Sequence, residues 1–249
     1  MHRRYDKTSL ETRPFILATI KHPSQSLESI ALYCRNIFPT CCAVCCDQIK
    51  QRETSRYEVE RKAVASSVLA RQYEFYAGRR VARAALSKLN SGNVFIPKGC
   101  GGEPIWPTNY VGSIAHSGSL ALAVVAKKSH VLSLGVDLEL ISAVTEDLWT
   151  LIFLPREIEY LYKVDICQRA VIATIMFSAK EAFYKLQYNV TRQYVDFLQT
   201  SVQVYYESNC VQIVVNNIML DDSRLQSIDG RFALSTSHVV TGFTLLSPS

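Results

Sequence analysis

The stretch "VLSLGVDLEL", residues 131–140, is mainly apolar but contains two carboxylates. Its composition predicts a buried β-strand, and side chains two residues apart in a strand lie on the same face of the sheet. Asp137 and Glu139 are therefore expected on one face, with Leu138 and Leu140 directed into the core. The break between two halves of the chain is expected near the start of this strand.

Two neighbouring carboxylates repel each other, and their burial costs several kcal/mol unless a positive group compensates. Mg²⁺ is such a group, because it prefers oxygen ligands and binds one or two carboxylates together with substrate phosphates. The alternative is an exposed edge strand whose acidic face is solvated. Taken alone, the pair Asp137 and Glu139 favours this second interpretation.

A second charged motif changes that balance. Residues 166–188 contain neither Gly nor Pro and predict a long, largely buried helix. Within it, Glu181 and Lys185 are i,i+4 neighbours, a spacing that on an exposed helix would indicate a common surface ion pair. Because the preceding turns are almost wholly apolar, we instead expect Glu181 to complete a three-carboxylate metal site. Lys180 and Lys185 are then expected near the phosphates that the metal would hold.

Basic residues precede this region. Residues 57–89 predict a helix, or two joined helices, and the Gly- and Pro-rich residues 93–107 predict a loop. Arg79 and Arg83 are i,i+4 neighbours and could grip a phosphate, although a solvated basic face is the alternative. His116 is expected to end a polar turn in which backbone N–H groups receive an anion, with a purely structural histidine as the alternative.

The remaining pattern predicts the fold class. A strand is expected over 119–126, and alternating residues in 201–207, 210–218 and 231–246 predict antiparallel strands. Strands and helices are mixed without regular βαβ alternation, which indicates an α+β fold.

Composition limits the function. The 249 residues are 48% hydrophobic and carry a net charge of +5, which is too mild for a nucleic-acid binder but suits an anionic ligand or partner. No apolar run approaches the ~20 residues of a membrane span, and residues 1–20 lack a signal-peptide pattern, so a cytoplasmic location is expected. The eight cysteines, four of them in "CCAVCC" (41–46), are expected to be reduced thiols, with zinc binding as the alternative.

Five stretches carry a family resemblance: "EFYAGRRVARAAL", "GGEPIWP", "VGSIAHSGSLALAVVA", "LGVDLELI" and "FSAKEAFYK". In this order they resemble the 4′-phosphopantetheinyl transferases, in the single-chain type that includes enterobactin synthase component D. The resemblance implies two similar α+β halves in a pseudo-twofold arrangement, with coenzyme A and Mg²⁺ between them. We place the coenzyme A-binding half at 1–132 and the Mg²⁺-binding, catalytic half at 133–249.

The resemblance implies transfer of the 4′-phosphopantetheine arm of coenzyme A to a serine of an apo carrier protein, with release of adenosine 3′,5′-bisphosphate. A carrier domain of a siderophore non-ribosomal peptide synthetase is the expected partner, and the chain is expected to be a monomer. Two alternatives are a metal-dependent phosphohydrolase or nuclease, and a non-catalytic coenzyme A-binding subunit of a synthase. The complete set of acidic residues and lysines argues against the second.

The site residues follow from the same resemblance. Mg²⁺ would be held by Asp137, Glu139 and Glu181, with Glu181 the first and Glu157 the second candidate for the base. Two positions depart from the family pattern: Ala115 stands where Ser or Thr is usual, and Phe177 where many relatives have Trp. The coenzyme would be bound by Arg71, Arg79, Arg83, Lys98, Gly99, Ser113, His116, Lys180 and Lys185.

Overall fold

The computed structural model describes residues 27–92 and 94–248. The expectations for the first 26 residues, namely the lack of a signal peptide and the start of the N-terminal half, lie outside the described residues. The α-helices are α1 (Leu27–Ile37), α2 (Glu58–Lys62), α3 (Leu69–Lys88), α4 (Trp149–Ile152), α5 (Pro155–Lys163) and α6 (Ile166–Thr191). The strands are β1 (Ala43–Gln48), β2 (Tyr110–Ser117), β3 (Leu120–Lys127), β4 (Val131–Leu140), β5 (Thr200–Tyr205), β6 (Cys210–Val215), β7 (Ser227–Leu234) and β8 (His238–Leu246). Short 3₁₀ helices are η1 (Glu146–Leu148), η2 (Phe197–Gln199), η3 (Tyr206–Ser208) and η4 (Ser223–Leu225).

The N-terminal half is an antiparallel sheet of order β1-β3-β2. The central strand β3 is buried on both faces, which explains why its sequence is a continuous apolar run. Its alternate residues enter two cores. Ala121, Ala123 and Val125 pack with α3, whereas Leu122, Val124 and Ala126 pack with α1 and with strand β4 of the other half.

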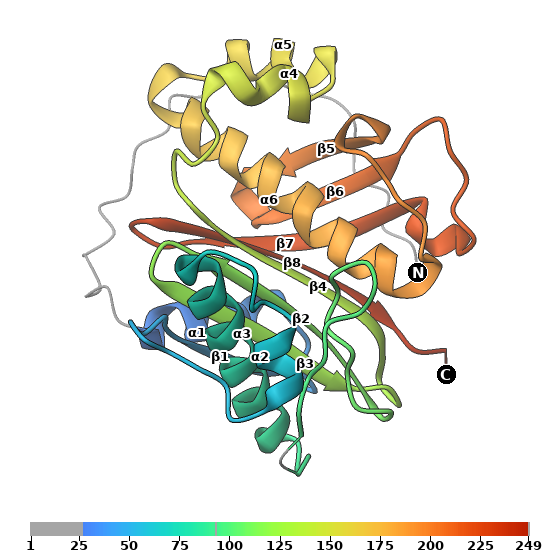
Figure 1. Ribbon diagram of the computed structural model, residues 1–249. Helices are drawn as coiled ribbons and strands as arrows, with labels where there is room; N and C mark the ends of the chain where they lie inside the picture. The colour runs from blue at the N-terminus through green and yellow to red at the C-terminus, as the bar shows by residue number, and fades with distance from the viewer. Residues whose placement is uncertain (1–26, 93, 249) are drawn as a thin grey trace.

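The C-terminal half is a five-stranded antiparallel sheet of order β4-β8-β7-β6-β5. Figure 1 shows α6 lying across this sheet, with α4 and α5 at one end of the helix. The core of this half joins α6 to α4 and α5 on one side and to the sheet on the other, through buried residues such as Phe153, Phe183 and Phe243. Of the helices that the structure describes, none combines the length and the apolar character needed to cross a bilayer.

The two halves repeat one motif, a strand followed by a long helix and a final hairpin. In the first half, β1 precedes α3 and pairs with β3, the second strand of the hairpin β2–β3. In the second half, β4 precedes α6 and pairs with β8, the second strand of the hairpin β7–β8. The prediction of an α+β chain built from two similar halves is confirmed. Their division between residues 132 and 133 stays a prediction, and β4 itself begins at Val131.

Some local predictions were wrong. Leu140 is 40% exposed rather than directed into the core, because it is the last residue of β4. His116 does not end a polar turn but lies within β2, opposite Ala121 of β3. The backbone around it therefore takes part in the sheet instead of forming an anion-binding turn.

The "CCAVCC" segment provides most of β1, which the sequence pattern did not predict. All eight cysteines are free thiols. Cys45 and Cys46 are half-buried and pack against the cores on the two faces of their sheet. Burial raises the pKa of Cys46 to about 12, which keeps this thiol protonated. The cysteines of β1 thus act as small hydrophobic residues.

Two contacts fix the position of β4, one within its own half and one to the N-terminal half. A Cβ atom added at Gly135 would lie 1.9 Å from the carbonyl oxygen of Ala182, so glycine allows α6 to pack closely against β4. On the other side, the Ser113 hydroxyl of β2 accepts a hydrogen bond from the Val136 N–H over 3.0 Å. Strand β4 is therefore fixed between α6 and β2, which determines what surrounds its two carboxylates.

Candidate active site

A cleft of about 440 Å³ lies between the two halves. Its walls come from α3, the loop after residue 97, β2, β4 and α6. This volume lies within the usual range for a small-molecule site. The cleft is acidic where β4 meets α6 and basic where α3 meets β2 and the loop.

The acidic end contains the three predicted carboxylates. Asp137 and Glu139 of β4 and Glu181 of α6 all line the cleft. Burial, together with the negative charges of Asp137 and Glu181, raises the pKa of Glu139 to about 7. Burial also raises the pKa of Glu181. These carboxylates are therefore short of compensating positive charge.

Lys185 supplies part of that charge. Its Nζ donates to Oδ1 of Asp137 over 2.6 Å. Burial acts to lower the pKa of Lys185, but the carboxylates of Asp137 and Glu181 outweigh it and raise the pKa overall. Lys185 is therefore held in its charged form at the acidic end.

The residues present fit a divalent cation. In the described part of the chain, no three His, Cys, Asp or Glu side chains lie close enough together to coordinate a metal ion as they stand. However, Oδ2 of Asp137 is buried and has no hydrogen-bond partner among the described residues, and one lysine faces three carboxylates. Oxygen ligands with unbalanced negative charge are the donor set that Mg²⁺ prefers.

The basic end contains Arg71, Arg79, Lys98 and His116, all of which line the cleft. Nη1 of Arg71 lies 2.6 Å from Nε2 of His116 and, because arginine only donates, the ring nitrogen accepts. Burial lowers the pKa of His116, which agrees with a neutral ring. Arg71 also pairs with Glu74 over 3.1 Å.

Arg79 is the most deeply buried cation of this end, at 5% exposure. Its guanidinium carbon lies 4.1 Å from the centre of the Phe75 ring, and its Nε donates to the carbonyl of Ile96 over 2.9 Å. Burial lowers its pKa only to about 10, so it stays charged. Its Nη2 is buried and, among the described residues, has no partner.

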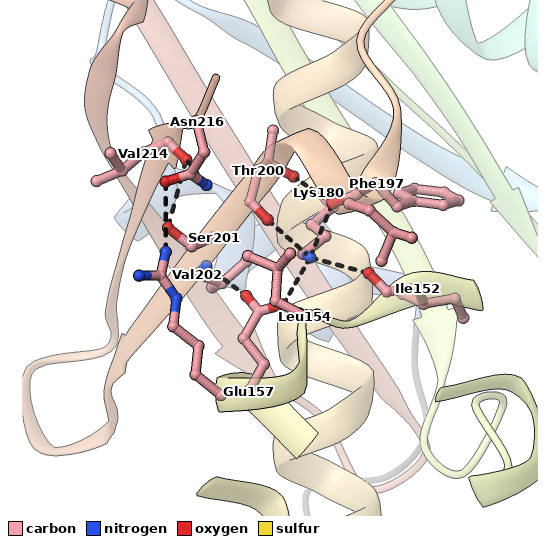
Figure 2. A network of polar contacts seen from close by, with 12 residues as sticks. Ile152, Leu154, Glu157, Lys180, Phe197, Thr200, Ser201, Val202, Val214 and Asn216 are labelled. Carbon is pink, nitrogen blue, oxygen red and sulfur yellow. Dashed lines mark hydrogen bonds and ion pairs between the residues drawn. The ribbon is translucent and has the colours of Figure 1, made fainter. Parts of the chain in front are cut away.

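The structure does not bring Lys180 or Glu157 to the cleft. Lys180 is buried and does not line the cleft. Its Nζ lies 2.8 Å from Glu157 and donates to the carbonyls of Ile152, Phe197 and Thr200, as Figure 2 shows. Adjacent helical residues point about 100° apart, so Lys180 cannot share the direction of Glu181. Lys180 and Glu157 therefore connect α6, α5 and β5, and we remove both from the proposed site.

Three other predicted residues lie elsewhere or act differently. Arg83 pairs with buried Glu60 over 2.6 Å and does not line the cleft. Gly99 does not line it either, and its N–H donates to the Glu103 carbonyl within the loop. Ser113 lines the cleft, but its hydroxyl already accepts a hydrogen bond from strand β4.

Comparison with known proteins identifies the family. Residues 59–126 match the 4′-phosphopantetheinyl transferase N-terminal domain, and residues 133–233 match the 4′-phosphopantetheinyl transferase superfamily. The chain is 30% identical over 196 residues to 4′-phosphopantetheinyl transferase PptT of Mycobacterium tuberculosis, covering 84% of that protein and 75% of this chain. The chain belongs to the 4′-phosphopantetheinyl transferases.

Other relatives of this transferase support the same family. 4′-Phosphopantetheinyl transferase Npt of Nocardia iowensis is 29% identical over 195 residues, which cover 87% of that protein and 74% of this chain. Enterobactin synthase component D of Escherichia coli (strain K12) is 36% identical, but over 85 residues, or 39% of that protein and 33% of this chain. The chain is an enzyme of a family that transfers phosphopantetheine from coenzyme A to carrier proteins.

The sequence reasoning missed several residues that line the cleft of this transferase. Tyr184 and Tyr188 follow Glu181 at helical spacing on the same face, and their rings stack with centroids 5.6 Å apart. That spacing could have identified them. Glu103 of the loop has no such signal, because its place in the cleft depends on a 2.7 Å ion pair with Arg192 at the end of α6.

Proposed function

We propose that this transferase binds coenzyme A across the cleft and transfers its 4′-phosphopantetheine arm to the serine hydroxyl of an apo carrier protein. The other product is adenosine 3′,5′-bisphosphate. The observation that supports this proposal is the meeting, in one cleft, of an acidic end and a basic end contributed by the two halves. Coenzyme A carries a 3′-phosphate, which the basic end can bind. It also carries the diphosphate at which the transfer occurs, and the acidic end can hold this group through Mg²⁺.

The basic end binds the phosphates that do not react. Arg71, Arg79 and Lys98 supply three cations, and arginine binds phosphate oxygens through paired N–H donors. His116 lies beside Arg71 and can orient it. These contacts exist before and during the reaction, so they hold the coenzyme in place rather than lower the barrier directly.

The acidic end holds the reacting diphosphate. Asp137, Glu139 and Glu181 would bind Mg²⁺, which when bound polarises phosphoryl oxygens. Lys185 offers a further positive charge to the phosphate oxygens, on which negative charge develops in the transition state. Phosphoryl transfer depends mainly on such positioning and charge neutralisation.

Glu181 is our candidate for the base. It lies in the cleft next to Lys185 and Asp137, where the serine of a carrier can approach the diphosphate. Its carboxylate would accept the hydroxyl proton as the serine oxygen bonds to the phosphorus that carries the pantetheine arm. The bond from that phosphorus to the bridging diphosphate oxygen then breaks, and the electron pair leaves with adenosine 3′,5′-bisphosphate.

The carrier that we propose is a peptidyl carrier domain of a siderophore non-ribosomal peptide synthetase. Its support is the similarity over 85 residues to enterobactin synthase component D. The net charge of +5 also suits an acidic partner.

Intact-protein mass spectrometry tests the proposal. An apo peptidyl carrier domain is incubated with the transferase, coenzyme A and Mg²⁺, in parallel with an apo acyl carrier protein of fatty-acid synthesis. We expect the carrier to gain one phosphopantetheinyl unit, the gain to stop with EDTA, and kcat/KM to favour the peptidyl carrier. A gain that is insensitive to EDTA would contradict the metal site, and a preference for the acyl carrier would contradict the proposed partner.

The same experiment separates the two alternatives. A phosphohydrolase would cleave coenzyme A without modifying any carrier, which the nucleotide products would reveal. A non-catalytic subunit would bind coenzyme A and leave both carriers unmodified.

A further inference from the structure

The backbone N–H and C=O groups of Ile96 are each bound by a buried charged side chain. Its N–H donates to Oε1 of Glu60 over 2.9 Å, and its carbonyl accepts from Nε of Arg79 over 2.9 Å. Ile96 is fully buried and lies in a segment without helix or strand, so no sheet neighbour is available for its peptide groups. The side chains of Glu60 and Arg79 therefore supply these hydrogen bonds.

Glu60 is itself firmly held. It is fully buried, and Oε1 also accepts a 2.6 Å hydrogen bond from Nη1 of Arg83. The Ser55 hydroxyl donates to its other oxygen, Oε2. A buried carboxylate with three donors around it has little freedom to move, and losing one of them would leave an unbalanced buried charge.

Arg79 is the only member of this chain of contacts that lines the cleft among the described residues. With Nε bound to Ile96 and its guanidinium against the Phe75 ring, its orientation is determined by the protein before any ligand arrives. Its buried Nη2 has no partner in the described part of the chain and is free to donate to a ligand. Burial lowers the pKa of Arg79, and the negative charge of Glu60 opposes this effect.

We propose that Glu60 and Arg83 are positioning residues for coenzyme A binding, because they fix the backbone of Ile96, which orients Arg79 toward a phosphate. This inference rests on the proposed function. It gives Arg83 a role that differs from direct phosphate binding: Arg83 acts through Glu60, and Glu60 acts through the backbone of Ile96. Ile96 precedes Lys98 by two residues, so the position of its backbone also affects a second cation of the basic end.

A double-mutant cycle on coenzyme A binding tests the inference. The dissociation constant of coenzyme A is measured by isothermal titration calorimetry for the wild type, Glu60→Gln, Arg79→Met and the double variant. We expect Arg79→Met to weaken binding by on the order of tenfold, the size of one hydrogen bond to a charged group. Glu60→Gln should weaken it by about threefold to tenfold, but should have no further effect once Arg79 is absent.

Kinetics provide a second readout. Glu60→Gln should raise KM for coenzyme A and leave kcat nearly unchanged, because Arg79 binds the substrate and the transition state alike. Arg83→Met should show the same pattern, whereas Arg83→Lys keeps a donor for Glu60 and should restore much of the affinity. If Glu60 and Arg83 contributed only to stability, their variants would have a lower melting temperature and an unchanged KM for coenzyme A.

Glu53→Gln is the matched control. Glu53 pairs with Arg80, which lies on helix α3 together with Arg79 and Arg83. Neither Glu53 nor Arg80 lines the cleft. This variant removes a comparable Glu–Arg pair but should leave the affinity for coenzyme A at its wild-type value. Because Glu60→Gln could fail to fold, Arg83→Met serves as the second variant, combined with Arg79→Met in the same cycle.

The outcomes are distinct. Additive effects of Glu60→Gln and Arg79→Met would overturn the inference, as would an equal loss of affinity in Glu53→Gln. Both of these results would leave the proposed function intact, because the wild type would still bind and use coenzyme A. Wild-type protein that does not bind coenzyme A would overturn the proposed function and this inference together.

Discussion

Nζ of Lys185 lies 2.6 Å from Oδ1 of Asp137, although the two residues are 48 positions apart in the chain. This contact joins α6 to β4 at the acidic end of the cleft. Asp137 is 3% exposed, and its second oxygen has no hydrogen-bond partner among the described residues. The pair is therefore incomplete as a purely structural ion pair, which is the arrangement expected where a cation completes the site.

Replacement of Asp137 by Asn should abolish most of the transferase activity. The change keeps the shape of the side chain but removes the charge that the metal and Lys185 require, so we expect kcat to fall by at least about a hundredfold. The fold should persist, because repulsion with Glu139 and Glu181 is relieved at the same time. Carrier loading and circular dichroism measure the two effects. Asp147→Asn, on exposed 3₁₀ helix η1, is the control, and equal activity of both variants would contradict the assignment.

Mg²⁺ should stabilise the protein in the absence of any substrate. A metal concentration of 100 times its dissociation constant adds about 2.7 kcal/mol, which corresponds to a rise of roughly 5–10 °C in melting temperature for a chain of this size. Differential scanning fluorimetry measures the shift. Glu139→Gln should lose most of it, since it removes one proposed ligand, and an unchanged shift in that variant would place the metal elsewhere.

Lys180→Met should unfold more easily than the wild type. The substitution leaves Glu157 as a buried carboxylate without its cation, which typically costs about 3–5 kcal/mol. Urea denaturation measures the free energy of unfolding. The double variant Lys180→Met, Glu157→Gln should recover part of the loss, because no unpaired charge remains. Lys163→Met, which breaks the exposed pair with Glu159, should change little; a similar loss there would show that burial is not the cause.

Gly135→Ala should displace α6 from β4. The added Cβ would meet the Ala182 carbonyl at 1.9 Å, and overpacking of this kind costs about 1–3 kcal/mol or more. Because Glu181 and Lys185 flank this contact on α6, kcat for the transfer should fall more than the loss of folded protein alone explains. Melting temperature and kcat are compared with those of Gly92→Ala, where an added Cβ would meet nothing within 4 Å. Full activity in Gly135→Ala would contradict the argument.

The strand that carries two of the carboxylates was predictable because its local pattern is strong. Residues 131–140 form β4 as expected, and the predicted helix over 166–188 corresponds to α6. β2 was not predicted as a strand, since "YVGSIAHS" contains glycine, serine and histidine instead of a clear alternation. β1 was missed for a similar reason, because cysteine gives little signal for a strand.

The positions of the site residues that local periodicity indicates were predicted correctly, and those of residues that depend on distant contacts were not. Asp137 and Glu139 were correctly placed on one face by the two-residue period of a strand, and both line the cleft. Lys180 and Arg83 were assigned to the phosphates because they are cations within matching motifs. Their partners Glu157 and Glu60 lie 23 positions away in each case, and no local period indicates such contacts.

By itself, the sequence determined β4 and α6, the shared face of Asp137 and Glu139, the i,i+4 spacing of Glu181 and Lys185, and the family. Periodicity and composition suffice for these features, since each depends on neighbours along the chain. Only the tertiary structure decided which cations reach the cleft. Whether a lysine or arginine faces a ligand or a buried glutamate depends on how the helices pack. Here the close contact at Gly135 fixes α6 against β4, and the buried Glu60 pairs with Arg83 away from the cleft.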